Sequence, residues 1–246
     1  MPDQPDQFEG RPAIIVVAKP PIPGRVKTRL IGHLSPRQAA AVHAAMQRCI
    51  MERVAEWISG SGDLVLALDT TISGSNRPAV THPPGWRRID QGGGDLGERL
   101  AFIWQRIGGG PAVFLGTDSP DVPMGALKSI LPALGRADAV IGPVRDGGYW
   151  VLAARAARSQ LLSGIDWGTD RVYHQTHEAA RRAGIGLVDI DSWFDIDTPD
   201  DLQALRRRLR RPADGSDDGA RDPRLVRLAA ELDQACLDQA CMEDPQ

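Results

Sequence analysis

Two acidic motifs hold the side chains of this sequence that are best suited to chemistry. Asp118 follows the apolar run Ala112–Leu115 within Gly-Thr-Asp-Ser-Pro, and Asp197 lies within Asp-Ile-Asp-Thr-Pro-Asp-Asp-Leu. The apolar run predicts a buried strand, so Asp118 comes just past a carboxyl end, where open α/β sheets bind ligands. Carboxylates there suit Mg²⁺ or Mn²⁺ carrying phosphates. We expect Asp118 and Asp197 to hold such a metal; in the alternative, Asp197 or Thr198 only caps the following helix.

A loop rich in cations follows the first predicted strand. The stretch Lys-Pro-Pro-Ile-Pro-Gly-Arg-Val-Lys-Thr-Arg-Leu begins at Lys19 and contains Gly24, Lys27, Thr28 and Arg29. The glycine lets the backbone approach a ligand, and the cations can form charge-assisted hydrogen bonds with phosphates. This is not a Walker loop, because valine instead of glycine precedes the second lysine. The stretch predicts a loop that wraps a di- or triphosphate, and an exposed basic turn is the alternative.

A glycine-rich stretch, Gln-Gly-Gly-Gly-Asp-Leu-Gly-Glu-Arg, contains Gly94 and Asp95. Its glycines fit the G-x-G-x-x-G dinucleotide pattern, but the segment before it is too polar for the buried strand which that pattern requires. We therefore favour a helix amino terminus that helps to hold a nucleotide or sugar, with a structural turn as the alternative.

A second glycine-rich stretch, Gly-Pro-Val-Arg-Asp-Gly-Gly-Tyr-Trp, lets the backbone pass close to a bound group, and either Tyr149 or Trp150 could stack on a ring. The turn Asp-Trp-Gly-Thr-Asp before a later helix is similar. A plain turn into a strand is the alternative for both. The candidate acceptor-binding residues are Asp146, Gly147, Gly148, Tyr149 and Asp170.

Strand and helix patterns alternate along the chain, which predicts a three-layer α/β fold with a mostly parallel, twisted sheet. We expect strands at 13–18, 63–68, 87–89, 112–115, 138–141, 149–153 and 186–190, with the strand at 149–153 reversed. Helices are expected at 36–58, 95–107, 123–134, 169–183, 199–211 and 225–242. Ser35 is placed to cap the first of these helices.

The bulk composition is that of a globular protein of ordinary polarity. The 246 residues are 42% hydrophobic and 25% charged, with a formal net charge of −3, so nothing in the overall charge attracts nucleic acid. No apolar run approaches the ~20 residues that span a bilayer, and no signal peptide is recognised. Three cysteines, an odd count, favour reduced thiols and a cytoplasmic location.

The expected organisation is a disordered amino terminus (1–11), one nucleotide-binding domain (12–211), a linker (212–223) and an amphipathic tail helix (224–246). The apolar stripe of the tail helix is expected to cover either the body of the protein or a second subunit, the latter giving a homodimer. The arginines between 206 and 211 predict a solvated helix face or, as the alternative, an anion-binding patch.

Five motifs in this order resemble the DUF2064 family of glycosyltransferase-A-like proteins, also labelled radical-SAM/selenodomain-associated transferases. They are Pro-Gly-Arg-Val-Lys-Thr-Arg-Leu, Gly-Asp-Leu-Gly-Glu-Arg, Gly-Thr-Asp-Ser-Pro, Gly-Pro-Val-Arg-Asp-Gly-Gly-Tyr and Asp-Ile-Asp-Thr-Pro-Asp-Asp-Leu, between residues 14 and 205. Lys-Thr-Arg-Leu is more distantly similar to a loop of phospholactate guanylyltransferases. The Asp-Thr-Pro-Asp-Asp-Leu turn is similar to one that supplies the second metal ligand in several sugar cytidylyltransferases.

The resemblance implies a nucleotide-diphospho-sugar-transferase (GT-A) fold with a divalent metal. Asp118 matches the first metal carboxylate and Asp197 the second, while Lys19, Lys27 and Arg29 match the phosphate loop. The glycosyltransferase Asp-x-Asp signature is replaced at position 118 by Thr-Asp-Ser.

The function hypothesis is nucleotidyl transfer from a nucleoside triphosphate to a small phosphorylated acceptor, with Mg²⁺ or Mn²⁺ and release of pyrophosphate. Lys27, Arg29 and Asp118 are the expected catalytic residues, because a triphosphate and its leaving group need several cations. One alternative is glycosyl transfer from a nucleotide-sugar to a small acceptor. The other is a nucleotide-binding module without turnover.

Overall fold

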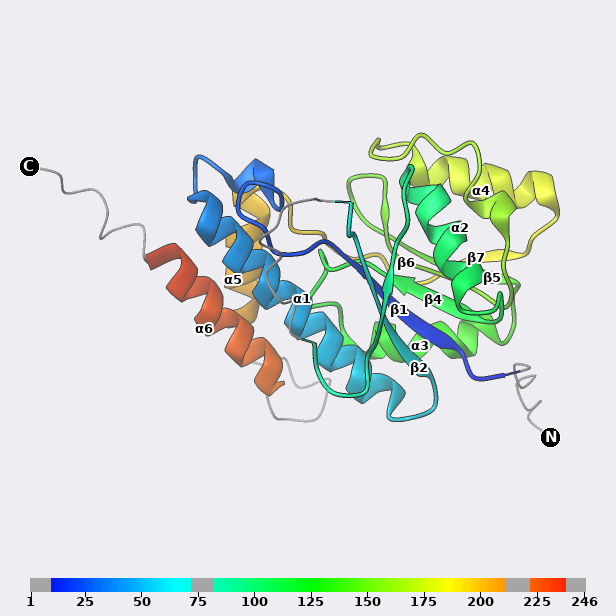
Figure 1. The fold of residues 1–246 in the computed structure, drawn as a ribbon, viewed down its shortest axis with the longest axis horizontal. Helices are drawn as coiled ribbons and strands as arrows, with labels where there is room; N and C mark the ends of the chain where they lie inside the picture. Colours follow the sequence, from blue (N-terminus) through cyan, green and yellow to red (C-terminus); the bar gives the residue numbers. More distant parts are fainter. Residues whose placement is uncertain (1–9, 72–81, 211–221, 238–246) are drawn as a thin grey trace, which may run out of the picture.

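The computed structural model describes residues 10–71, 82–210 and 222–237 (Figure 1). Its described residues form a seven-stranded sheet in the order β3-β2-β1-β4-β6-β5-β7. The strands are β1 (Ala13–Ala18), β2 (Asp63–Leu68), β3 (Arg87–Asp90), β4 (Ala112–Leu115), β5 (Ala139–Pro143), β6 (Tyr149–Ala154) and β7 (Leu187–Asp189). Strand β6 runs antiparallel to β4 and β5, and the other pairings are parallel. The expected sheet with one reversed strand is confirmed.

Helices cover both faces of the sheet, which gives the three-layer arrangement (Figure 1). Alternate residues of each central strand point to opposite faces, so strands buried on both sides are apolar at consecutive positions. Ile14 and Val16 of β1 pack with α1 (Pro36–Ile58) and α3 (Met124–Leu134). Ile15 packs on the other face with α2 (Leu96–Arg106), and α4 (Val172–Ala183) covers that same face. Two short 3₁₀ helices, η1 (Thr28–Leu30) and η2 (Ser159–Leu161), complete these layers.

Local sequence signals fix where the helices begin. The Ser35 hydroxyl accepts a hydrogen bond from the Gln38 amide at 3.3 Å, and the Gln38 side chain accepts one from the Ser35 amide at 2.8 Å. This reciprocal capping box satisfies backbone donors that the first helical turn leaves free. Asp95 and Glu98 form the same arrangement at the start of α2. The predicted Ser35 cap is therefore confirmed.

A further apolar cluster joins α5 (Pro199–Arg210) and α6 (Pro223–Leu237) to α1. Leu228 and Leu232 of α6 are fully or almost fully buried there. The apolar stripe of the tail helix therefore covers the body of its own chain, and burying it requires no second subunit. Pro223 starts this helix, whereas a linker was expected to include it. The rest of that linker, from 212 to 221, lies outside the described residues, as do residues 1–9.

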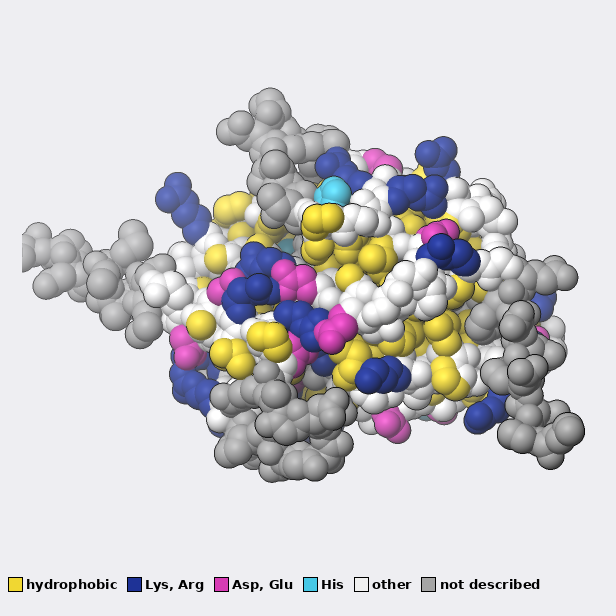
Figure 2. Space-filling view, turned by 90° about the horizontal axis from the view of Figure 1, so that it is seen from below, with side chains coloured by type: hydrophobic (Ala, Val, Ile, Leu, Met, Phe, Trp, Pro, Cys, Tyr) yellow, Lys and Arg dark blue, Asp and Glu magenta, His cyan; other side chains and the backbone are white. Residues whose placement is uncertain are grey.

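Ion pairs fasten α6 to its neighbours. Arg206 and Arg210 of α5 both pair with Asp233. Both ion pairs lie within the chain, and Arg210 is still 59% exposed, as expected for a solvated helix face, whereas Arg206 is 25% exposed. Figure 2 shows cationic and acidic side chains interleaved where α6 meets α1, and the pairs there are Arg48–Glu231, Arg224–Glu56 and Arg227–Glu52.

One buried arginine connects the tail helix to the loop after β4. The Arg53 guanidinium donates to the Asp222 carboxylate at 3.0 Å and to the Pro120 carbonyl at 2.8 Å. Its side chain is 3% exposed. A buried charge is tolerated only with such partners. Arg53 thereby links Asp222, just before the tail helix, to Pro120, which is two residues after Asp118.

Across the three described stretches, no helix combines the length and the apolar character needed to cross a membrane.

Candidate functional site

The candidate site lies at the sheet edge where the parallel strands end. The register pairs Ala18 with Leu68 and Leu68 with Asp90, so β1, β2 and β3 finish side by side. Strand β4 ends at this edge too, and the reversed β6 begins there. A cleft of about 670 Å³ opens between the loops that follow. Of the predicted site residues, it is lined by Lys19, Lys27, Thr28, Arg29, Gly94, Asp95, Asp118, Tyr149 and Asp197.

Lys27 lies at the centre of the predicted catalytic group. Its Nζ is 2.5 Å from Asp118 Oδ1 and 3.1 Å from Asp197 Oδ1, and it donates to the Ile196 carbonyl at 2.5 Å. An ammonium group has three N–H donors, so these acceptors satisfy it completely. Burial lowers the pKa of Lys27, but the two carboxylates outweigh that effect and raise it. The side chain, only 4% exposed, is therefore a buried and permanently charged cation.

The structure brings Asp118 and Asp197 together, as predicted. The Ile196 amide donates to the Asp118 carbonyl at 3.0 Å, which ties the two acidic loops to each other. Burial raises the pKa of Asp118, yet the charge and hydrogen bond of Lys27 outweigh it and hold that pKa below its usual value. Asp197 also pairs with the exposed Arg29 at 3.3 Å. The cation between the two carboxylates is the Lys27 ammonium.

Helix capping next to Asp197 falls to other residues. The Asp201 carboxylate accepts from the Thr198 amide at 2.8 Å and from the Thr198 hydroxyl at 2.6 Å. The Asp201 amide in turn donates to the Thr198 hydroxyl at 3.3 Å. Thr198 therefore caps the helix, as the alternative for this turn had it. Asp197 does not serve only as a cap, because its carboxylate binds Lys27 and Arg29.

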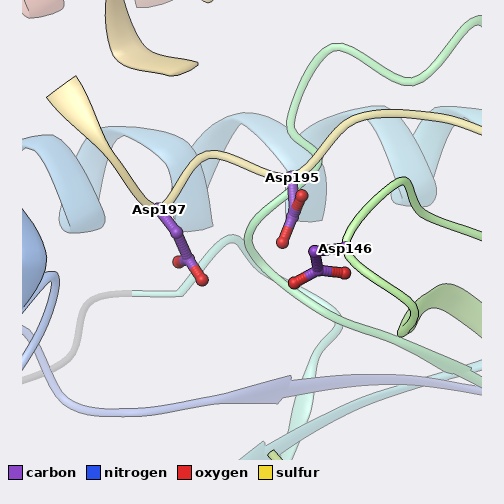
Figure 3. Close-up of side chains that lie close together, drawn as sticks. All are labelled: Asp146, Asp195 and Asp197. Atoms are coloured by element: carbon purple, nitrogen blue, oxygen red, sulfur yellow. The ribbon is translucent and has the colours of Figure 1, made fainter. Parts of the chain in front are cut away.

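A second group of carboxylates lies beside this pair. Oxygens of Asp146, Asp195 and Asp197 lie within 4.8 Å of one another, and Figure 3 shows the three side chains converging from two loops. Burial, together with the nearby charges of Asp146 and Asp197, raises the pKa of Asp195 to about 7. Hard oxygen donors at this spacing fit Mg²⁺ or Mn²⁺. The repulsion that raises the Asp195 pKa is what a cation would relieve.

Of the predicted acceptor-binding residues, only Tyr149 lines the cleft. A Cβ at Gly147 would lie 2.0 Å from the Asp170 carbonyl oxygen, and the Tyr173 amide donates to the Gly147 carbonyl at 2.8 Å. Gly147 and Asp170 thus lock two loops together, and neither lines the cleft; Gly148 also lies outside the lining. Tyr149 does line it, and its hydroxyl is buried without a hydrogen-bond partner among the described residues.

Trp150 was an alternative candidate for stacking on a ring. Its side chain belongs to the core, where the residue is 4% exposed, and its indole N–H donates to the Asp191 carbonyl at 3.0 Å. The structure therefore uses Trp150 for packing.

On the nucleotide side, Gly94 has a φ of +89°, and a Cβ there would collide with the Glu98 carboxylate of the capping box. The Asp95 side chain is committed to that same box. Gly24, with a φ of +76°, turns the cation-rich loop and does not line the cleft.

The family profile described as "Uncharacterized protein conserved in bacteria (DUF2064)" matches residues 55–169. The resemblance to DUF2064 is confirmed. A candidate nucleotide-diphospho-sugar transferase from Desulfovibrio desulfuricans G20 superposes with a TM-score of 0.73 at 28% identity, covering 92% of this chain and 96% of that one. Among functionally curated proteins, none matches this chain.

Two more distant structures share the fold alone. CMP:2-keto-3-deoxy-manno-octonic acid synthetase complexed with CTP gives a TM-score of 0.54 at 13% identity, covering 81% of this chain and 98% of that one. The 4-diphosphocytidyl-2C-methyl-D-erythritol synthase of Anaerococcus prevotii DSM 20548 gives 0.50 at 10% identity, covering 83% and 98%. The fold of this chain is therefore that of nucleotide-diphospho-sugar transferases.

Two residues of the site received no role from the sequence. Asp195 lies two positions before Asp197, and that spacing in an extended segment places both carboxylates on one side. His43 lines the cleft from α1, with Nε2 3.0 Å from the Lys19 carbonyl. Burial lowers the pKa of His43, which favours the neutral form of its ring. No motif around His43 could have revealed it, because its place depends on how α1 packs.

Proposed function

We propose that this chain is a Mg²⁺-dependent nucleotidyltransferase, which moves a nucleotidyl group from a nucleoside triphosphate to a phosphorylated acceptor and releases pyrophosphate. The observation that carries the proposal is the assembly of Lys27 with Asp118 and Asp197 in one cleft. Lys19 and Arg29 line the same cleft. Three cations from one loop suit the charge of a triphosphate better than that of a diphosphate.

The loop after β1 would bind the phosphates. Arg29 is 69% exposed and is oriented by Asp197, so its remaining guanidinium donors are available to a ligand. Lys19 follows β1 directly, and its carbonyl is held by His43. Charge-assisted bonds from these side chains would stabilise the negative charge that gathers on the departing pyrophosphate.

The carboxylates Asp118, Asp146, Asp195 and Asp197 would hold the metal. When bound, Mg²⁺ would neutralise phosphate charge and orient the reacting phosphate. Lys27, whose ammonium lies between Asp118 and Asp197, keeps these side chains near one another. The loop carrying Asp146 is fixed by Gly147 against Asp170, so that carboxylate is held in place before a ligand arrives.

No protein nucleophile is required by this reaction. An oxygen of the acceptor phosphate attacks the α-phosphorus, the bond from that phosphorus to the bridging oxygen breaks, and pyrophosphate leaves with the electron pair. The protein contributes position and charge. Tyr149, at the side of the cleft next to the Asp146 loop, would contact the acceptor, and its unpartnered hydroxyl could bind a polar group there.

Glycosyl transfer is the second candidate, favoured by the description of the Desulfovibrio desulfuricans protein as a nucleotide-diphospho-sugar transferase at 28% identity. The same cations would then hold the diphosphate of a nucleotide-sugar, and the nucleoside diphosphate would leave.

Pyrophosphate release separates the two reactions. The purified protein should be incubated with each nucleoside triphosphate, Mg²⁺ and a panel of sugar phosphates and other phosphorylated acceptors, with Asp118→Asn as the inactive control. We expect pyrophosphate from at least one pair, falling at least ~100-fold in the control, because a lost transition-state contact costs about that much. Hydrolysis or transfer from a nucleotide-sugar without any pyrophosphate would support the glycosyl reaction. Nucleotide binding without turnover that survives Asp118→Ala would contradict both.

A further inference from the structure

Lys27 has an unusual position for a side chain of a phosphate-binding loop. Its backbone φ is +46°, a left-handed conformation that costs a non-glycine residue free energy, and its side chain is buried. All three of its donors are bound by acceptors of the protein: Asp118, Asp197 and the Ile196 carbonyl. As it stands, this lysine has no donor left for a phosphate.

The Lys27 ammonium takes up one oxygen of each of the two carboxylates that a divalent ion would use. Oδ1 of Asp118 and Oδ1 of Asp197 both face the Nζ atom. A second cation bound to the same oxygens would lie only a few ångströms from Nζ, where like charges repel strongly and partial burial weakens solvent screening. Lys27 and a metal therefore cannot both keep full contact with these two side chains.

We propose that Lys27 is the resident cation of the metal site: it competes with the divalent metal for Asp118 and Asp197 until a phosphate ligand draws it away. This inference rests on the metal of the proposed function, and it adds that the binding of this metal is controlled by Lys27. A metal that arrives alone must displace Lys27. A metal that arrives with a polyphosphate finds Lys27 attracted to the phosphate instead, so the two ligands favour each other's binding.

Neighbouring residues are consistent with this exchange. Thr28 and Arg29 follow Lys27 along the cleft wall, so a phosphate bound by them would lie beside the lysine. Asp146 and Asp195 lie close to Asp197 but outside the contacts of Lys27. Lys27 and Arg29 are thus the cations that pair with Asp118 and Asp197, and among the described residues neither Asp146 nor Asp195 forms an ion pair.

The test measures metal binding in the absence of nucleotide. Mn²⁺ is titrated into the apoprotein and the free ion is followed by electron paramagnetic resonance, for the natural chain and for Lys27→Met. We expect Lys27→Met to bind Mn²⁺ about tenfold more tightly or better, because the competing charge is gone. Lys128→Met, at an exposed position of α3 that does not line the cleft, makes the same change in net charge and should leave the affinity within about twofold. Arg29→Met, which removes an exposed partner of Asp197, should have a smaller effect than Lys27→Met.

A second measurement does not depend on any variant folding. The chain has three lysines, Lys19, Lys27 and Lys128, so nitrogen-15 resonances of the lysine side chains can be assigned and followed. Mg²⁺ should shift the Lys27 signal and leave that of Lys128 in place, and inorganic pyrophosphate added with Mg²⁺ should shift Lys27 further.

The failures can be told apart. Mn²⁺ that binds the natural chain but binds Lys27→Met equally or more weakly would overturn the competition while leaving the metal of the proposed function intact. A Lys27 resonance that ignores bound Mg²⁺ would do the same. Absence of Mn²⁺ binding by both the natural chain and Lys27→Met at millimolar concentration would overturn the metal itself, and the inference with it.

Discussion

Replacing Asp195 by asparagine should stabilise the metal-free protein at alkaline pH. Burial, Asp146 and Asp197 raise the pKa of the Asp195 carboxyl from an ordinary 3.8 to about 7 in the folded state. A carboxyl with a raised folded pKa binds its proton more tightly when folded. The free energy of unfolding therefore falls as pH rises from about 4 to about 7, and stays low above that.

The size of the effect follows from the shift. A change of about three units corresponds to about 4 kcal/mol for a fully buried, isolated group. Asp195 is only half-buried, and solvent screening reduces the figure to about 1–2 kcal/mol. Asparagine has nearly the same shape and no charge, so Asp195→Asn should gain that amount at pH 8 and almost nothing at pH 4.

Urea unfolding at 25 °C in excess chelator, repeated from about pH 2 to pH 8, measures this difference. Asp118→Asn is the matched control with the opposite sign, because the pKa of Asp118 is lowered and its charge supports the fold at neutral pH. That variant should lose stability at pH 7 and approach the natural chain as pH falls below about 4. Equal stability of Asp195→Asn and the natural chain at pH 8 would refute the reasoning.

Two further substitutions test the framework of the site and of the tail. Gly147→Ala should lower the free energy of unfolding by at least ~2 kcal/mol, since its Cβ would lie 2.0 Å from the Asp170 carbonyl oxygen. Gly164→Ala, also at positive φ but with nothing within 4 Å of its Cβ, should lower it by only about 1 kcal/mol. A difference below about 0.5 kcal/mol in urea midpoints would contradict the close approach. Leu232→Ala on α6 should cost about 2–4 kcal/mol because Leu232 is fully buried, whereas Val226→Ala, at a residue 45% exposed, should cost less than about 1 kcal/mol. Equal small losses would mean that α6 does not belong to the folded body.

Most of the scaffold could be predicted from local patterns. Runs such as Ala112–Leu115 are apolar at every position because both faces of a parallel sheet are covered, and this signal does not depend on distant residues. The carboxyl ends of such strands meet at one edge, so the closeness of Asp118 and Asp197 also followed from order along the chain.

The contacts within the site could not be predicted in the same way. Asp118 and Lys27 are far apart in sequence, and whether Lys27 binds a phosphate or a carboxylate depends on where its side chain ends. Gly147 was predicted to bind the acceptor because its glycine pattern indicates a close approach. The pattern does not say which group comes close, and in the structure it is the backbone of Asp170. Likewise, an amphipathic tail predicts a buried stripe but not the surface that buries it, which is α1 and α5 of the same chain.

The buried guanidinium of Arg53 makes the far end of the chain a structural support for the cleft. Shortening the protein after α5 would strip that group of its carboxylate partner and leave a bare charge beneath the loop that carries Asp118. A truncated protein could keep every residue that lines the cleft and still lose the shape of the cleft. A bulky fusion that displaces α6 would weaken the same contact between Arg53 and Asp222.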